Sequence, residues 1–168
     1  MLKKLILLLL VIAPVAMFAQ DKIAYINSSD ILAVMPELKE VETKLANKRE
    51  TVTKRLAAIE QEYQKKLEEF RGDTTELSPS VIQDRQNQIE NLDKRYQEYA
   101  QSSSTEFEQE RQTLIAPLKE RLRKAIKEVG DENNYTYILD LISGAVVHMG
   151  SNAIDANQQV KNKLGITN

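Results

Sequence analysis

Two long segments of the chain carry apolar residues at intervals of three and four, with charged and amide side chains between them. Lys48 stands at the skipped position of the first stripe, whose apolar members are Leu38, Val41, Leu45, Val52, Leu56, Ile59, Tyr63, Leu67 and Phe70. A stripe this narrow fits the seam of a coiled coil, whereas a helix in a globular core needs a wider apolar face. Residues 37–70 are therefore predicted to form one long helix that packs against a single partner helix.

The second stripe lies on a longer segment that follows a Gly-Asp-Thr-Thr break. Ser78 followed by Pro79 is a typical helix start, because the first turn does not need the N–H donor that proline lacks. From there to Gly130 the apolar positions, mostly three or four apart, are Ile82, Ile89, Leu92, Tyr96, Tyr99, Phe107, Leu114, Leu118, Leu122, Ala125 and Val129. Both stripes are buried only if the helices fold back antiparallel. We therefore predict a helical hairpin over residues 36–130, with its tip near residues 71–79.

The second helix has two predicted weak points. Ser102, Ser103 and Ser104 place hydroxyl groups across the stripe, and Pro117 lies inside the helical pattern. Proline within a helix removes one backbone hydrogen bond and clashes with the preceding turn. A kink near Thr113 is therefore expected.

The segments that flank the hairpin are predicted to contain strands. Residues 22–27 form a short apolar run with β-branched and aromatic members, which indicates a buried strand. Residues 135–141 indicate a second strand, and residues 145–149 a third that pairs with it as a β-hairpin through a turn at Ser143-Gly144. Both are expected to pair with the first strand.

Two short helices are predicted beside these strands. Ser29 or Asp30 is expected to cap one that ends before Pro36, because proline disfavours a helical conformation in the residue before it. Asp155 is expected to cap a final helix that ends at Gly165.

Together these elements define the expected architecture. The predicted fold class is α+β and mostly α, with a long antiparallel α-helical hairpin that projects from a small β-rich body. Residues 20–35 and 131–168 are expected to form the body. Tryptophan is absent, aromatic residues make up 5% of the chain and charged residues 29%. Such a composition cannot fill a large spherical core, which agrees with the narrow stripes.

The first 19 residues predict export. Lys3 and Lys4 precede an apolar run that ends in small residues at Ala19, as in a secretory signal peptide. The run is shorter than the roughly 20 residues that a membrane span needs. We expect cleavage after Ala19; an uncleaved anchor is the alternative. Residues 1–19 contain two lysines and no acid, so their removal changes the net charge from −2 to −4, which argues against nucleic-acid binding.

The sequence offers no candidate residue for catalysis, cofactor binding or metal binding. Cysteine is absent, and His148, the only histidine, makes a poor metal site without a second soft ligand. Pairs such as Glu40 with Lys44 are interpreted as solvated helix-surface pairs, since they lack the burial that tunes a catalytic pKa. No Gly-rich phosphate-binding loop occurs. We therefore expect a non-enzymatic protein that uses neither a cofactor nor ATP.

The order of signal peptide, strand, helical hairpin, further strands and terminal helix resembles that of the Skp/OmpH family of periplasmic chaperones. The likeness is carried by Lys22-Ile23-Ala24-Tyr25-Ile26-Asn27, by Tyr137–Met149, and by Ser151-Asn152 with the helix that starts at Asp155. Members of that family are homotrimers in which a small β-rich body joins three subunits and three hairpins enclose a cavity. The resemblance implies a periplasmic, ATP-independent holdase that binds unfolded outer-membrane proteins before their insertion, with the membrane-insertion machinery as a candidate partner.

Two sets of residues follow from this resemblance. The trimer-forming body is expected to include Ile23, Tyr25, Ile26, Ile138, Leu139, Val146, Val147 and Met149. Near the tip, where only two helices meet, client contacts are expected at Tyr63, Leu67, Phe70, Leu77, Val81 and Ile82. The alternative for each of these six is that it holds the two helices together. The alternative function is an exported coiled-coil structural or adaptor protein that binds a folded envelope partner. Because the mature chain is slightly acidic, no lipopolysaccharide site is carried over.

Overall fold

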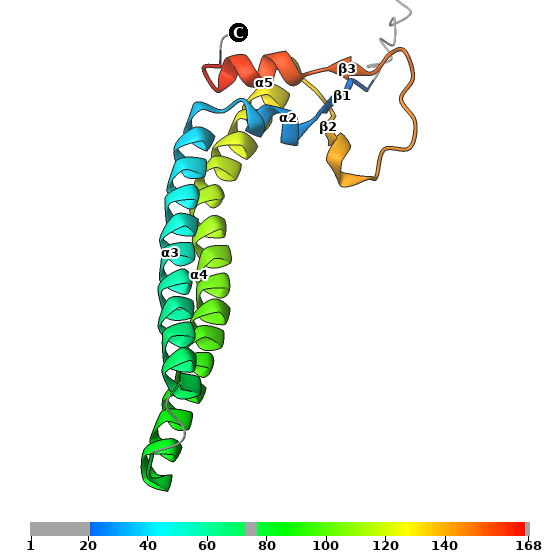
Figure 1. Ribbon diagram of the computed structural model, residues 1–168. Helices are drawn as coiled ribbons and strands as arrows, with labels where there is room; N and C mark the ends of the chain where they lie inside the picture. Colours follow the sequence, from blue (N-terminus) through cyan, green and yellow to red (C-terminus); the bar gives the residue numbers. More distant parts are fainter. Residues whose placement is uncertain (1–20, 73–76, 167–168) are drawn as a thin grey trace, which may run out of the picture.

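The computed structural model describes residues 21–72 and 77–166. In chain order the elements are β1 (Ile23–Ile26), α2 (Ser28–Ala33), α3 (Pro36–Gly72), α4 (Pro79–Asn133), β2 (Tyr137–Asp140), the 3-10 helix η1 (Leu141–Ser143), β3 (Ile154–Asp155) and α5 (Asn157–Lys163). Figure 1 shows α3 and α4 side by side as one arm, with the sheet, α2 and α5 gathered at one end of it. The predicted fold class, a long antiparallel helical hairpin on a small β-containing body, is confirmed. The predicted signal peptide and its cleavage site lie outside the described residues.

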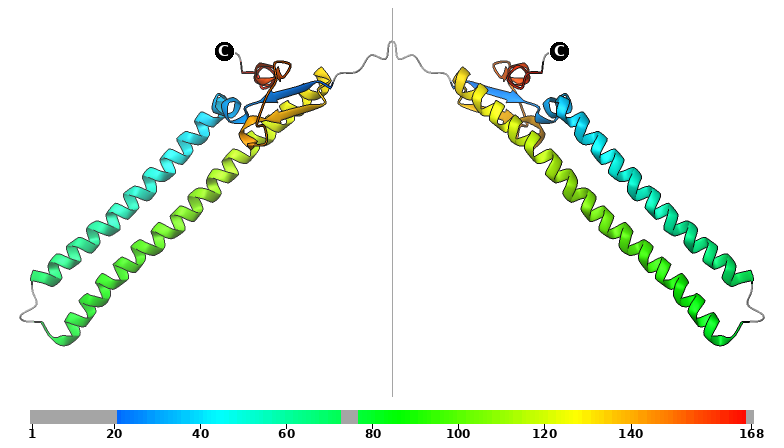
Figure 2. Two further views of the ribbon diagram at one scale, coloured as in Figure 1. Left: turned by 90° about the vertical axis from the view of Figure 1, so that its right-hand side faces the viewer. Right: turned by 90° about the vertical axis from the view of Figure 1, so that its left-hand side faces the viewer.

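The arm is held together by a core one side chain deep. Ile59 of α3 is 2% exposed and Leu92 of α4 is also buried, but most other stripe residues near the middle of the arm are half-buried. Figure 2 shows why: over most of their length the two helices have no other element beside them. At about 1.5 Å per residue, the 37 residues of α3 extend roughly 55 Å and the 55 residues of α4 roughly 80 Å. The two stripes therefore form the predicted hairpin seam.

Lys48, at the skipped position of the first stripe, ties the two helices together. Its ammonium nitrogen lies 3.3 Å from a carboxylate oxygen of Glu106 and 3.6 Å from one of Glu110, both on α4. The hydrogen bond to Glu106 raises the pKa of Lys48. Beside it, the Arg49 guanidinium carbon lies 5.3 Å from the centre of the Phe107 ring, a cation–π contact. Charged groups thus align the helices where the apolar seam is interrupted.

Helix α4 is continuous through Pro117. Near the expected kink, the Thr113 hydroxyl donates to the carbonyl of Gln109 at 2.9 Å, a bond that competes with the helix backbone, and the helix continues across it. Ser103, the middle one of the three serines, is buried on the seam side of the helix, whereas Ser102 and Ser104 are exposed. Neither predicted weak point ends the helix.

The two ends of α4 are capped. Pro79 is its first residue and Ser78 its N-cap, as the sequence predicts; the backbone carbonyl of Ser78 accepts the N–H of Ile82 at 3.1 Å, and its side chain makes no cap hydrogen bond. At the other end Asn134 adopts a left-handed conformation with φ of 55°, and the Tyr135 N–H donates to the Gly130 carbonyl at 3.0 Å. This is a Schellman-type ending with asparagine in place of glycine. It turns the chain from the arm into β2.

The body contains a three-stranded parallel sheet in the order β2-β1-β3. On one side of β1, Ile23 is registered with Tyr137 and Ile26 with Asp140. Parallel neighbours cannot be joined by a tight turn and need a long crossover connection. Here the connection between β1 and β2 comprises α2 and the entire arm.

The predicted β-hairpin after α4 is wrong. Asp140, the last residue of β2, accepts the N–H of Ile142 at 3.3 Å and that of Ser28 at 3.1 Å. It thereby starts the short helix η1, which ends at Gly144 with a left-handed φ of 69°. The chain leaves the sheet at this point, and residues 145–149 form no strand. The third strand is β3, which is parallel to β1.

The two short helices begin differently from the prediction. Asn27 is the N-cap of α2, and its side-chain oxygen accepts the N–H groups of Ser29 and Asp30 at 3.1 and 3.2 Å. Those two residues, predicted as caps, lie inside the helix. Asp155 accepts the N–H of Asn157, the first residue of α5, at 2.8 Å, but does so from the end of β3 and not from the N-cap position.

One face of the sheet packs against the helices of the body. Ala24 and Ile26 of β1 are fully buried there, and the remaining core residues are Ile31, Met35, Val41, Leu118, Leu122, Ala125, Val129, Ala156, Val160 and Leu164. Ile138 of β2 lies over Gly130 of α4, where an added β carbon would stand 3.4 Å from its δ carbon. The Ile138 side chain thus packs directly on the backbone of α4 at Gly130.

Candidate binding surfaces

The other face of the sheet is apolar and open. Successive side chains of a strand point to opposite faces, so Ile23 and Tyr25 point away from the helices that bury Ala24 and Ile26. Ile23 is 42% exposed. Leu139 of β2 is 40% exposed and is registered with Tyr25. These three side chains face away from the core of the subunit.

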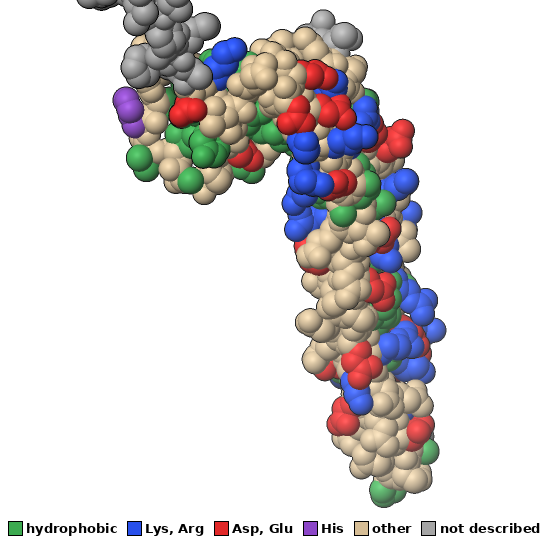
Figure 3. Space-filling model, turned by 180° about the vertical axis from the view of Figure 1, so that it is seen from behind, with side chains coloured by type: hydrophobic (Ala, Val, Ile, Leu, Met, Phe, Trp, Pro, Cys, Tyr) green, Lys and Arg blue, Asp and Glu red, His purple; other side chains and the backbone are tan. Residues whose placement is uncertain are grey.

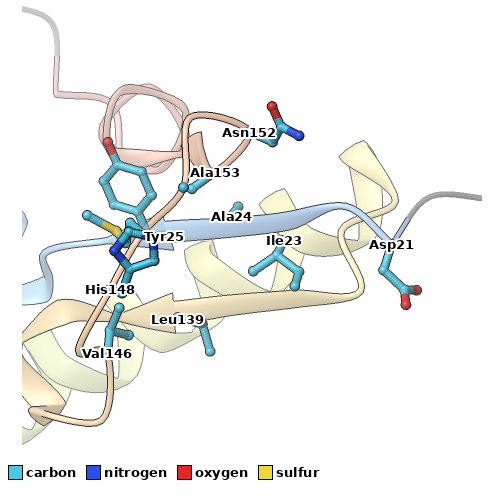
Figure 4. A pocket seen from close by; sticks show the side chains of 11 residues that line it. Asp21, Ile23, Ala24, Tyr25, Leu139, Val146, His148, Asn152 and Ala153 are labelled. Carbon is cyan, nitrogen blue, oxygen red and sulfur yellow. The ribbon is translucent and has the colours of Figure 1, made fainter.

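The segment between η1 and β3 borders this face and helps to enclose a hollow of about 300 Å³. Val146, His148 and Met149 come from this segment and line the hollow together with residues of β1 and β2. Figure 4 shows the His148 imidazole next to the Tyr25 ring, whereas Asp21 lies at the far end. We call the surface formed by Ile23, Tyr25, Leu139, Val146 and Met149 the open sheet face.

Further large apolar side chains are exposed beside the open sheet face. Val147 is 97% exposed, and Tyr137 and Ile142 are exposed as well. Figure 3, which views the molecule from behind, shows hydrophobic side chains gathered on the body, while Lys, Arg, Asp and Glu side chains follow the arm. Contiguous exposed apolar patches mark interaction sites in soluble proteins. The body therefore carries a surface suited to contact with another chain.

The structure divides the predicted trimer-body residues into two groups. Ile26 and Ile138 pack against the subunit's own helices, and Ile26 is 1% exposed. The others lie on the open sheet face or directly beside it, and they are Ile23, Tyr25, Leu139, Val146, Val147 and Met149. Only the second group is accessible to another chain.

The six predicted client-contact residues lie toward the free end of the arm, and none of them is fully buried. Val81 is exposed, and the half-buried members are Tyr63, Leu67, Phe70, Leu77 and Ile82. Arg85 of α4 donates to the Glu69 carbonyl of α3 at 3.1 Å and so holds the two helix ends together. Residues 73–76 of the predicted tip lie outside the described residues. Apolar side chains at this end pack across the hairpin and also expose part of their surface.

A second hollow, of about 240 Å³, lies between α3 and α4 nearer the middle of the arm. Its lining residues are Ile59, Glu60, Tyr63, Leu92, Asp93 and Tyr96. Ile59 and Leu92 belong to the buried seam, whereas the two tyrosines are half-buried. Tyrosine tolerates such a setting because its ring packs against apolar groups while its hydroxyl stays hydrated. The two helices of the arm thus form a partly apolar hollow between them at this level.

An ion pair at the base of the arm connects three helices. Arg121 of α4 pairs with Glu37 of α3 and donates to the Leu164 carbonyl, at the end of α5, at 2.8 Å. Lys163 of α5 hydrogen-bonds to Glu132 of α4 at 2.5 Å, and this bond raises the pKa of Lys163. The terminal helix thereby fixes the base of the arm to the body.

Sequence reasoning missed these contacts at the base. Arg121 and Glu37 belong to different helices and Leu164 contributes only its backbone carbonyl, so no local spacing reveals the cluster. A signal existed for Lys48, since a lysine at a seam position needs an acidic partner on the facing helix. Which glutamates provide it depends on the register of the hairpin.

Two kinds of feature are absent from the residues that the structure describes. Within residues 21–72 and 77–166, no group of three or more His, Asp or Glu side chains is arranged to hold a metal ion. In the same ranges no helix is both long enough and apolar enough to cross a membrane. What the molecule presents is an apolar face on the body and partly exposed apolar positions along a charged arm.

Comparisons with known proteins agree with this arrangement. A family model described as outer membrane protein (OmpH-like) matches residues 22–164. The "Chaperone protein Skp" of Vibrio cholerae serotype O1 is 25% identical over 129 residues, which cover 74% of each chain. A crystal structure of a candidate outer membrane chaperone (OmpH-like) from Caulobacter crescentus superposes with a TM-score of 0.72 at 16% identity, covering 87% of this chain and 85% of the other. The last comparison concerns the fold alone.

Proposed function

Because the chain belongs to the family of OmpH-like outer membrane chaperones, we propose that it is a periplasmic, ATP-independent holdase for unfolded outer-membrane proteins. In this role it prevents their aggregation before membrane insertion. One observation carries the proposal: the arm exposes part of its apolar seam toward its free end, on a surface otherwise made of charged side chains. Such a surface binds apolar chains without being insoluble itself.

The chemistry of an unfolded barrel protein matches this surface. Its strands carry apolar side chains at every second position, and these have no partner outside the membrane. Burying one such side chain contributes about 1 to 2 kcal/mol when burial is partial. Val81 and its half-buried neighbours each make a weak contact with the same client chain. Because that chain links the contacts, the affinity for the whole client exceeds the affinity of any one contact. The client is held tightly, yet no single contact fixes its conformation.

We further propose that three copies assemble through the body. The open sheet face and the exposed Val147 beside it form an apolar surface that the subunit does not bury by itself. Both β2 and β3 are edge strands, and an unpaired strand edge is a template for pairing with another chain. Assembly through this surface would point three arms in one direction around a shared space. Signal-peptide cleavage after Ala19 and export to the periplasm belong to the same proposal.

Dilution of an unfolded barrel protein from urea tests the proposed function. The mature chain should suppress the rise in turbidity, with half-suppression near one trimer per client, and a complex of that mass should elute on size exclusion. An equal mass of an unrelated folded protein serves as the control and should leave the turbidity unchanged. Unchanged turbidity with the mature chain, together with co-purification of a folded envelope protein, would favour the adaptor alternative.

A further inference from the structure

The hollow of about 240 Å³ between α3 and α4 has an apolar floor and an aromatic rim. The floor is formed by Ile59 and Leu92, which are buried. Tyr63 and Tyr96 line the hollow beside them and are half-buried, so part of each side chain stays accessible. Pockets for small molecules usually enclose about 300 to 1,000 Å³. A hollow below that range suits one long side chain of another molecule and not a folded partner.

Two carboxylates, one from each helix, complete the lining. Glu60 of α3 accepts a hydrogen bond from the Gln64 amide at 2.7 Å, and Asp93 of α4 accepts one from the Gln97 amide at 2.8 Å. Both donors are neutral and lie one turn along the same helix. Within residues 21–72 and 77–166, no lysine or arginine forms an ion pair with either carboxylate, and both side chains are exposed. The rim of the hollow is therefore negatively charged.

The other side of the seam at the same level is neutralised. Along α3, Glu60 directly follows one seam residue and Glu62 directly precedes the next, so the two glutamates flank the apolar stripe on opposite sides. Glu62 pairs with Arg95 of α4 at 2.6 Å, and a separate hollow of about 250 Å³ contains this pair. At this level the arm thus pairs its charges on one side of the seam and leaves two carboxylates without a cation on the other.

We propose that the hollow lined by Glu60, Tyr63, Asp93 and Tyr96 binds an arginine side chain of the unfolded client. This inference rests on the proposed holdase function and assigns the chemistry of one client contact. The aliphatic stem of arginine packs on apolar groups while its charged head stays in water, as the floor and rim require. The guanidinium pairs with carboxylates and stacks on aromatic rings. Lysine fits less well, because its ammonium lacks the planar fork that does both.

The expected contribution is modest because the rim is hydrated. Exposed ion pairs and exposed cation–π contacts are each weak, and salt screens the charges. Together they should strengthen binding by about three- to tenfold relative to an uncharged polar side chain. Apolar contacts of the same client elsewhere on the arm supply the remaining affinity. The hollow therefore sets a preference among client segments.

Peptide binding to the full mature chain tests the inference. The first probe is a fluorescent peptide with the alternating apolar pattern of one barrel strand and a single arginine at its centre. The second probe has glutamine in place of the arginine. Fluorescence anisotropy at low salt should give a dissociation constant about three- to tenfold lower for the arginine peptide, and the difference should shrink at high salt. Equal dissociation constants at low salt would overturn the inference.

A charge-matched pair of variants separates the hollow from the net charge of the arm. Glu60→Gln with Asp93→Asn keeps the shape of both side chains, removes their charges and should bring the two dissociation constants together. The control is Glu50→Gln with Glu98→Gln, which removes the same charge from the same helices at carboxylates that already pair with a lysine. The control should keep the preference for arginine. Loss of the preference in the control, or its survival in Glu60→Gln with Asp93→Asn, would refute the site.

Tyrosine ring resonances locate the bound arginine in the unchanged chain. The arginine peptide should shift the signals of Tyr63 and Tyr96 more than the glutamine peptide does. Tyr135, whose hydroxyl donates to Gln159 in the body at 2.9 Å, is the internal control and should keep its signal. Unchanged signals of Tyr63 and Tyr96 would contradict the inference while leaving the holdase function intact. Binding of neither peptide, together with unsuppressed client turbidity, would instead refute the holdase function and this site with it.

Discussion

Ile59 shows how much a single side chain contributes in a core this thin. It is 2% exposed although only two helices meet around it, since Leu92 and the tyrosines beside it close the seam. No third element can move in to fill a vacancy at this level. A truncation here therefore leaves a cavity that collapses poorly.

We expect Ile59→Ala to lower the free energy of unfolding by about 2 to 4 kcal/mol, because buried methylene groups are lost and a cavity remains. Urea unfolding followed by circular dichroism, at one fixed protein concentration, measures the change. Lys54→Ala is the matched control on the same helix: its exposed ion pair with Glu50 contributes at most about 1 kcal/mol. Equal unfolding midpoints for the two variants would show that the seam does not hold the arm together.

At the residue scale, local chemistry predicted some positions and not others. The Ser78-Pro79 start of α4 was predictable because proline and serine act on their own neighbourhood. The start of α2 was not, since Asn27, Ser29 and Asp30 are all good capping residues and the sequence does not rank them. The backbone decides for Asn27, whose extended conformation directs its side-chain oxygen at the N–H groups of Ser29 and Asp30.

At the scale of elements, the free end of the arm is where the proposed client contacts coincide with the packing of the two helices. Leu77 is half-buried just before α4, and Val81 is exposed in its first turn. Their side chains contribute less to the seam than Ile59 does. They can therefore be changed without unfolding the arm.

We expect the double change Leu77→Ser and Val81→Ser to raise several-fold the amount of chain needed for half-suppression of client turbidity. Thermal unfolding should shift by only a few degrees, because neither residue is buried. The control is Gln83→Ser with Asn87→Ser, which alters a polar pair of the same helix and should leave suppression unchanged. Equal suppression by both double variants would place client contact elsewhere on the molecule.

The strands illustrate why the individual elements were easier to predict than the pairing between them. The apolar run of β1 is a strand as predicted, and so are residues 137–140 of the 135–141 run. Residues 145–149 have the same alternating character, yet form no strand within the subunit. Strand propensity says that a segment's side chains suit a half-buried sheet surface, but it does not specify which strand the segment pairs with. The parallel neighbour of β2 lies more than 100 residues away, at β1, and no local pattern encodes that pairing.

At the scale of the whole molecule, the length of the arm determines the shape in solution. A compact domain of about 150 residues has a radius of gyration near 15 Å. Helix α4 alone is roughly 80 Å long. The body adds mass at one end only, which Figure 1 makes clear.

We expect small-angle X-ray scattering to give a radius of gyration above about 20 Å for a single subunit and a larger value for an assembly. The pair-distance distribution should show a long tail produced by the arm. A variant that shortens α3 and α4 by matched segments should lose the tail while keeping the core of the body. A value close to that of a compact domain would be incompatible with a free-standing arm.

The arm leaves the sheet after β1 and returns at β2, the strand hydrogen-bonded to it. Both ends of the arm are therefore anchored side by side in the sheet. The contacts in the body and at the base of the arm do not depend on the length of the helices beyond them. Seven residues inserted into each helix would carry the tip outward by about 10 Å and leave every body contact in place. The length of the arm can therefore change without any change in the body, and under the proposed function a longer arm would enclose a larger client.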